Sequence, residues 1–210
     1  MLQILIFAEC LIFTRVFNGW LYMEVDQKSD YNKNVFLIGL MGAGKTSVGR
    51  MLSRVLEKEF YDSDLVIEEK TGVKITDIFD IEGEAGFRKR ECGVINQLTG
   101  MSGIVLATGG GVILNAGNRE NLKTKGTVIY LHAEVSELYK RTKHDLRRPL
   151  LDTDDVKGRL CQLYQVRDPL YRAIADLVFE TKSQGISELA EDIIATLRSK
   201  SSAGSRGLKK

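Results

Sequence analysis

The sequence is poor in residues that form disulfides or bind transition metals. Its 210 residues include three cysteines, Cys10, Cys92 and Cys161, which lie far apart and show no paired spacing for zinc. An odd number of widely separated cysteines is typical of reduced thiols in a reducing compartment. The two histidines, His132 and His144, have no partner at a spacing that indicates a metal site or a catalytic triad. We therefore expect core or incidental cysteines, and we assign the histidines no function.

An excess of charge of one sign is also lacking. Thirty basic residues face 28 acidic ones, so no overall field favours nucleic acid or an anionic membrane. The apolar fraction of 43% and the charged fraction of 28% are typical of a soluble globular enzyme. A chain of 210 residues suits one α/β domain with a substantial core. We expect a cytoplasmic protein with no nucleic-acid partner.

The N-terminal region has no hydrophobic segment of membrane length. Residues 2–13 are nearly all apolar, but a membrane span needs about 20 apolar residues. No basic region precedes them, as a signal peptide would require. We expect translation to begin at Met23 and the upstream residues to be a gene-model artefact; a membrane-associated extension is the alternative. Residues 1–33 are thus predicted to be an extension, disordered or artefactual, with no stable membrane association.

Two kinds of apolar pattern alternate along residues 34–198. Short, wholly apolar runs are typical of strands buried on both faces, and they occur at 35–38, 104–107, 128–131 and, more weakly, 177–179. Between them, apolar residues recur at helical spacing. Strands that alternate with helices predict an α/β fold whose parallel sheet is covered on both faces. Residues 199–210 are rich in Ser, Gly and Lys, and we expect a flexible basic tail.

The first predicted strand leads into a phosphate-binding motif. Residues 39–46, G-L-M-G-A-G-K-T, match G-x-x-x-x-G-K-[ST] and lie between a buried strand and an amphipathic helix. Glycines let the backbone N–H groups of the loop converge on phosphates, and the positive end of the following helix adds to the attraction. Lys45 can then reach the β- and γ-phosphates, and the Thr46 hydroxyl can bind Mg²⁺.

Other nucleotide-binding classes are not indicated. The strand at 104–107 ends in Thr108 and glycines and not in the acidic residue of a usual Walker B strand. No N-K-x-D guanine-reading motif is present, and 210 residues leave no room for motor machinery. The sequence therefore indicates a small-molecule kinase.

Five further segments carry candidate acceptor-binding residues. Asp62 and Asp64 follow a short extended segment and would point the same way, one toward the metal's water shell and one toward the acceptor; alternatively, Asp64 is only a helix N-cap. Residues 83–91 place charges on a helix, where a solvated face is the usual explanation. The glycines of 108–111 lie at the carboxyl end of a strand, where ligands bind in open α/β sheets, although a plain loop is the alternative. Basic residues at 147–151 suit a mobile lid or a surface loop.

The last of these segments, residues 167–171, is R-D-P-L-Y, in which Pro169 marks a kink or break in a long helix. Together the motifs resemble those of the shikimate kinase family. The matching elements are G-L-M-G-A-G-K-T, F-Y-D-S-D, G-E-A-G-F-R-K-R-E, A-T-G-G-G, R-R-P-L-L and R-D-P-L-Y. They occur in family-like spacing over residues 34–198, which is nearly everything outside the two tails.

The resemblance implies a fold and a reaction. The fold is a P-loop domain like that of nucleoside monophosphate kinases: three layers around a five-stranded parallel sheet, with a substrate-binding segment at about 62–92 and a lid at about 142–155. The reaction is transfer of the γ-phosphoryl group of ATP to the 3-hydroxyl of shikimate, giving shikimate 3-phosphate and ADP on the way to chorismate and the aromatic amino acids. Mg²⁺ would be the cofactor, and we expect a monomer.

The resemblance also implies roles for individual residues. Asp64 would hold the shikimate hydroxyls and could take the proton of the attacking one. Arg88 and Arg167 would clamp the substrate carboxylate, and Gly110 would add a backbone contact. With Asp64, the catalytic residues would be Lys45 and the lid residue Arg148. Thr46 would bind Mg²⁺, with Asp62 in its outer shell. The ATP-binding residues would be Gly42, Ala43, Gly44, Lys45, Thr46, Ser47, Arg148 and Gln184.

Physical chemistry supports this assignment. The guanidinium of arginine binds a carboxylate through two parallel hydrogen bonds. An acceptor with a carboxylate therefore explains the presence of two arginines. Two alternatives remain: a related P-loop kinase for gluconate or a nucleoside monophosphate, and a non-catalytic nucleotide-binding module that switches a partner. An acceptor panel separates the first, and the absence of turnover would indicate the second.

Overall fold

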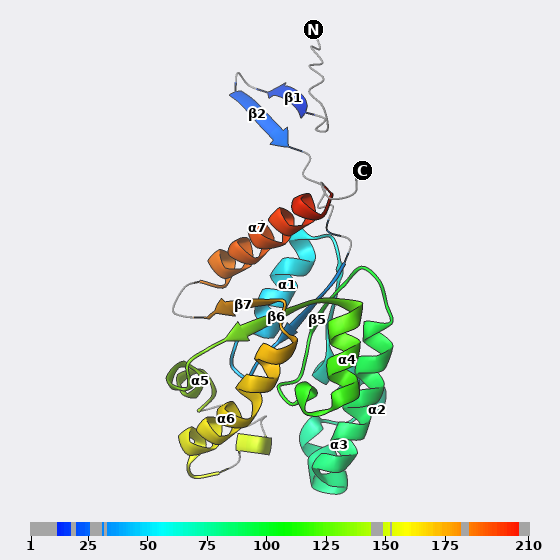
Figure 1. The fold of residues 1–210 in the computed structure, drawn as a ribbon, viewed down its shortest axis with the longest axis vertical. Helices are drawn as coiled ribbons and strands as arrows, with labels where there is room; N and C mark the ends of the chain where they lie inside the picture. The colour runs from blue at the N-terminus through cyan, green and yellow to red at the C-terminus, as the bar shows by residue number, and fades with distance from the viewer. Residues whose placement is uncertain are drawn as a thin grey trace.

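The central feature of the fold is a parallel sheet of five strands. The computed structural model describes residues 12–17, 20–25, 31, 33–143, 149–151, 153–181 and 185–205 (Figure 1). The strands lie in the order β4-β5-β3-β6-β7, and every neighbouring pair is parallel. This confirms the predicted α/β class and the five-stranded parallel sheet. Their bounds are β3 (Asn34–Ile38), β4 (Glu59–Asp62), β5 (Ile104–Ala107), β6 (Gly126–His132) and β7 (Leu177–Glu180).

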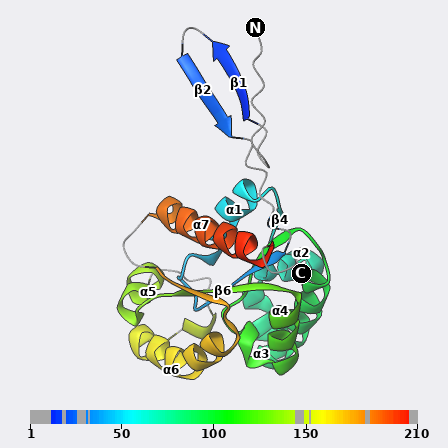
Figure 2. The same cartoon turned by 45° about the horizontal axis from the view of Figure 1, so that its top comes forward.

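Helices cover both faces of the sheet, as its apolar strands require. Helix α1 packs against α7 on one face, and α4 and α6 pack against β6 on the other (Figure 2). Helices α2 and α3 pack together beyond β4, and α5 packs against α6. The bounds are α1 (Lys45–Val55), α2 (Ser63–Thr71), α3 (Ile75–Thr99), α4 (Ala116–Lys125), α5 (Val135–Thr142), α6 (Val156–Ile174), α7 (Ile186–Ser205) and two 3₁₀ turns, η1 (Val112–Leu114) and η2 (Pro149–Leu151).

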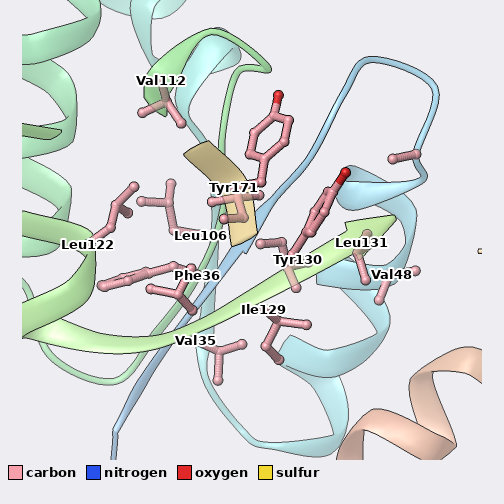
Figure 3. Close-up of a cluster of buried hydrophobic side chains, with 14 of the residues drawn as sticks. Val35, Phe36, Val48, Leu106, Val112, Leu122, Ile129, Tyr130, Leu131 and Tyr171 are labelled. Atoms are coloured by element: carbon pink, nitrogen blue, oxygen red, sulfur yellow. The ribbon is translucent and has the colours of Figure 1, made fainter. Parts of the chain in front are cut away.

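The core is built from the central strands. Phe36, Leu106 and Ile129 are fully buried, and they belong to β3, β5 and β6, which lie side by side (Figure 3). Fully burying such side chains stabilises the fold by about 1.5–3 kcal/mol each. In the register of the sheet, Leu37 faces Ala107 on one neighbour and Ile129 on the other. This register aligns the carboxyl ends of the strands.

The side on which successive strands join the sheet changes at β3. From β3 it passes through α1 to β4 on one side, and from β5 it passes through α4 to β6 on the other. Such a switch leaves a crevice at the carboxyl ends of the strands, where ligands bind. The loop after β3, the acidic pair at the end of β4 and the glycines after β5 all meet there. The fold thus brings three motifs that are far apart in sequence to one edge.

The structure describes elements at both ends of the chain, beside the predicted domain boundaries. Strands β1 (Ile12–Phe17) and β2 (Trp20–Val25) form an antiparallel pair, and the predicted start, Met23, lies within β2. Tyr31 is buried in the core and hydrogen bonds to Thr127, so core contacts begin before the predicted boundary at residue 34. Helix α7 continues to Ser205, so the predicted boundary at residue 199 falls inside a helix.

Helix α6 also bears on a prediction. Pro169 was expected to mark a kink or break; the helix continues through it to Ile174, so the proline does not break the helix. In the part of the chain that the structure describes, no helix has the length and apolar character needed to cross a membrane.

Candidate active site

One cavity collects most of the predicted site residues. It has a volume of about 790 Å³ and lies at the carboxyl edge of the sheet. Ala43 is buried and does not line this cavity. Arg148 and Gln184 lie outside the described residues, as do the other residues of 144–148 and residue 152 of the predicted lid. The predicted residues that line the cavity are Gly42, Gly44, Lys45, Thr46, Ser47, Asp62, Asp64, Arg88, Gly110 and Arg167.

The phosphate-binding loop lies at one end of this cavity. Gly44 has a left-handed backbone (φ 89°) and precedes the first turn of α1. Lys45 is only 8% exposed, and its Nζ donates hydrogen bonds to the carbonyl oxygens of Gly39 and Leu40, both at 2.8 Å. The lysine charge is therefore held inside the curve of the loop, beside the positive end of α1. This arrangement is suited to bind a polyphosphate.

Thr46 and Asp62 place two side-chain oxygen atoms that can bind a metal or its water beside the loop. The Thr46 hydroxyl donates to Asp62 Oδ2 at 2.7 Å, and both residues line the cavity. Magnesium prefers oxygen ligands and is usually held by one or two protein groups together with phosphates and water. The donor set therefore fits Mg²⁺, which would reach this pair together with a nucleotide.

The roles of the two aspartates separate clearly. Asp62 is the N-cap of α2, because its Oδ1 accepts from the Asp64 backbone N–H at 3.1 Å. The alternative in which Asp64 caps the helix is therefore wrong. Asp64 lies in the first turn of α2 and lines the cavity. Its carboxylate lies beside Gly109.

A second carboxylate, Glu91, approaches Asp64 across Gly109. A Cβ atom at Gly109 would lie 2.6 Å from Asp64 Oδ1 and 3.0 Å from Glu91 Oε1, so only glycine fits between them. Glu91 is fully buried. Burial raises its pKa to about 7; Arg88 opposes this shift, and Asp64 adds to it. Ser63 fixes the same glycine, because its Oγ accepts from the Gly109 N–H at 2.8 Å.

Arg88 is held by two carboxylates. Its Nε and Nη2 donate to Glu84 Oε1 at 3.1 and 2.8 Å, and its Nη1 donates to Glu91 Oε2 at 2.8 Å. The guanidinium lies so close to Gly111 that a Cβ atom there would overlap both Nη atoms. The solvated-face explanation for residues 83–91 therefore fails at Arg88 and Glu91, which face the cavity.

Arg167 reaches the cavity from α6. It is 3% exposed, and burial lowers the pKa of its guanidinium, with nearby Arg88 also lowering it. Its buried Nη1 has no hydrogen-bond partner among the described residues. A buried cationic donor is costly unless an acceptor meets it. The two guanidiniums thus offer a binding place for an anionic group.

Three residues that contact the predicted site residues or the loops around them were not identified from the sequence. Glu91 lies within a charged run that gives no sign of which residues turn inward. Ser63 looks like a spacer between two acids. Arg141 of α5 donates to the carbonyl oxygens of Gly42 at 3.3 Å and Thr181 at 3.0 Å, and thereby joins α5 to the phosphate-binding loop. The i, i+3 spacing of Arg88 and Glu91 was the one available signal, because such pairs share a helix face.

Comparison with known proteins finds a consistent set of relatives. The family model described as shikimate kinase matches residues 41–198. A shikimate kinase of Cupriavidus pinatubonensis is 54% identical over 164 residues, covering 78% of this chain and 85% of the relative. A shikimate kinase of Nitrosospira multiformis is 51% identical over 171 residues, covering 81% and 88%.

Solved structures give the same result. A shikimate kinase from Acinetobacter baumannii, in complex with shikimate, is 46% identical with a TM-score of 0.80, covering 83% of this chain and 96% of that chain. A gluconokinase from Sinorhizobium meliloti has a TM-score of 0.50 at 16% identity, covering 85% and 99%. That second likeness concerns the fold alone.

Proposed function

Because the chain belongs to the shikimate kinase family, we propose that it transfers the γ-phosphoryl group of ATP to the 3-hydroxyl of shikimate, releasing ADP and shikimate 3-phosphate. The observation that carries this proposal is the single cavity that joins a phosphate-binding loop to a carboxylate and two inward-facing arginines. The product would serve the biosynthesis of chorismate and the aromatic amino acids. We expect the enzyme to act as a cytoplasmic monomer.

The nucleotide end of the cavity would position and neutralise the phosphates. Lys45 would bind the β- and γ-phosphates, aided by the backbone N–H groups of residues 42–47. Thr46 would bind Mg²⁺, and Asp62 would hold the metal's water shell; when bound, the ion supplies charge neutralisation at the phosphates. Arg148, Gln184 and the lid at about 142–155 remain proposed parts of this half.

The acceptor end would hold shikimate by its carboxylate and hydroxyls. Arg88 and Arg167 would meet the carboxylate, and Gly110 would contribute a backbone contact. Asp64, whose side chain does not cap its helix, would accept a hydrogen bond from the attacking hydroxyl. This would leave the hydroxyl oxygen directed at the γ-phosphorus.

Positioning and charge stabilisation account for most of the expected rate enhancement. As the new O–P bond forms and the bond to ADP breaks, the hydroxyl proton passes to the Asp64 carboxylate. Negative charge on the transferring group is met by Lys45 and, in the closed lid, by Arg148. Fixed charges in a site that excludes water stabilise such charge more than they would in solution.

The test is an acceptor panel with the purified full-length chain. ATP consumption is measured with shikimate, gluconate and nucleoside monophosphates offered separately. A Lys45→Met chain purified alongside reports any contaminating kinase. We expect turnover with shikimate alone; turnover with gluconate or a nucleotide in its place would reject the proposal, and ATP binding without turnover would favour a switch module.

A further inference from the structure

A buried tyrosine links the acceptor-binding groups to one another. Tyr171 of α6 is fully buried, and its hydroxyl donates a hydrogen bond to the Gly110 carbonyl oxygen. Arg167 lies one helical turn earlier, so both side chains share a face of α6. Burial raises the pKa of the Tyr171 hydroxyl, although the adjacent Arg167 guanidinium opposes the shift. The phenol therefore stays protonated and remains a donor at any working pH.

The hydrogen bond fixes a peptide at a crowded point. A Cβ atom at Gly110 would lie 3.4 Å from both the Gly39 carbonyl oxygen and the Met41 backbone nitrogen, and 3.6 Å from the Tyr171 hydroxyl. The hydroxyl thus lies where α6, the glycine loop and the phosphate-binding loop meet. Because a peptide unit is planar, holding the Gly110 carbonyl also fixes the N–H of the next residue on the opposite side.

The turn of α6 that carries Arg167 needs such support from outside the helix. Pro169 lies inside the helix and has no N–H, so the Gln165 carbonyl lacks its usual partner. Tyr130 of β6 supplies part of the support. Its ring stacks on Tyr171 with 4.9 Å between centroids (Figure 3). Its hydroxyl donates to Asp168 Oδ1 at 2.9 Å. The two phenols bind the weakened turn to the sheet and to the glycine loop.

We propose that Tyr171 is a positioning residue for substrate binding, whose hydroxyl holds the Gly110 peptide and the Arg167 guanidinium in the one arrangement that receives a carboxylate. This role rests on the proposed function, in which Gly110 and Arg167 bind the acceptor. Tyr171 itself does not line the cavity. Loss of its hydroxyl should therefore weaken binding of the acceptor and leave binding of the nucleotide unchanged.

The test compares Tyr171→Phe with Tyr164→Phe in the full-length chain. Tyr164 is the matched control, because it lies on the same helix and its hydroxyl hydrogen bonds a distant group, His132 Nε2, at 2.8 Å. Steady-state kinetics give KM for each substrate and kcat. We expect Tyr171→Phe to raise KM for shikimate about three- to tenfold, the range of one buried hydrogen bond. KM for ATP should stay within twofold, and Tyr164→Phe should leave both values within twofold.

Thermal denaturation with saturating ligand adds a readout that a purely structural role would not change. Ligands that bind the folded state raise Tm according to their affinity. Shikimate should stabilise Tyr171→Phe less than it stabilises the parent and Tyr164→Phe, whereas ATP should stabilise all three equally. This comparison holds even if Tyr171→Phe is less stable without ligand.

The outcomes separate two failures. If Tyr171→Phe lowers Tm but leaves KM for shikimate unchanged, the residue is structural only and the inference is overturned. If KM values for ATP and shikimate rise together, the hydroxyl supports the whole site and the selective role is also overturned. A parent chain that neither phosphorylates nor binds shikimate would instead overturn the proposed function, and this role with it.

Discussion

Arg167→Lys is the substitution that most directly tests the identity of the acceptor. Arg167 is 3% exposed, and its Nη1 has no hydrogen-bond partner among the described residues. Arg88, in contrast, already donates three hydrogen bonds to Glu84 and Glu91. Lysine keeps the positive charge at position 167 but loses the planar fork that matches a carboxylate. The loss should therefore appear in substrate binding more than in stability.

The size of the effect follows from the bond that is lost. A hydrogen bond to a charged group contributes about 1.5–3 kcal/mol, which corresponds to about a ten- to a hundredfold change in affinity. We expect KM for shikimate to rise by this factor in Arg167→Lys, with KM for ATP within twofold. Arg88→Lys serves as the contrast, because it also deprives the buried Glu91 carboxylate of a well-placed partner. That variant should lose a few degrees in Tm as well.

The assay uses shikimate and an analogue whose carboxylate is replaced by a carboxamide. The analogue should bind poorly to the parent and be nearly indifferent to Arg167→Lys, because the arginine cannot lose a charged partner that the ligand does not carry. If Arg167→Lys weakened ATP and left shikimate untouched, the acceptor site would lie elsewhere. An equal loss for both acceptors would show that the guanidinium does not recognise the carboxylate.

Three further results are expected. Asp64→Asn should lower kcat by about a hundredfold or more and leave KM for ATP unchanged; near-parent turnover would refute its role toward the hydroxyl. Gly111→Ala should raise KM for shikimate about tenfold or more by displacing the Arg88 fork, whereas Gly93→Ala, where a Cβ atom meets nothing within 4 Å, should not. The folded state keeps Glu91 protonated up to pH about 7, whereas the unfolded carboxyl ionises near 4.5. The stability of the parent relative to Glu91→Gln should therefore fall as pH rises between these values and level off above them; a Tm difference independent of pH would contradict this.

The sheet and the phosphate-binding loop could be predicted because local pattern and tertiary environment agree there. Residues 35–38 and 104–107 are wholly apolar and are fully buried in central strands. The weakest predicted strand, at 177–179, forms the edge strand β7, in which half-buried and exposed positions alternate. An edge strand buries less of its surface, so its sequence carries a weaker signal.

The acceptor site was harder to predict because its residues break the usual patterns. Arg88 and Glu91 lie in a charged run on α3, and such runs usually face solvent. Here Arg88 and Glu91 line the cavity from one side of a charged helix, while Lys89 and Arg90 are exposed on its other side. The spacing of Asp62 and Asp64 likewise could not tell which carboxylate caps α2. That choice depends on backbone geometry at the end of β4, which sequence alone does not give.

The arrangement of the two arginines explains why the site should prefer an anionic acceptor. Arg88 and Arg167 belong to different helices and lie about eighty residues apart in the sequence. Their positive charges repel each other across the cavity. Burial and the proximity of Arg88 both lower the pKa of Arg167, which means that both make its charged form less favourable. Glu91 offsets part of this cost, but burial raises its own pKa to about 7 and weakens its negative charge near neutral pH. A ligand carboxylate would complete the neutralisation, whereas a neutral polyol would leave the buried Arg167 guanidinium beside Arg88 without that added anion. Selectivity for a carboxylate would then come as much from repulsion between the arginines as from the bonds that the ligand forms.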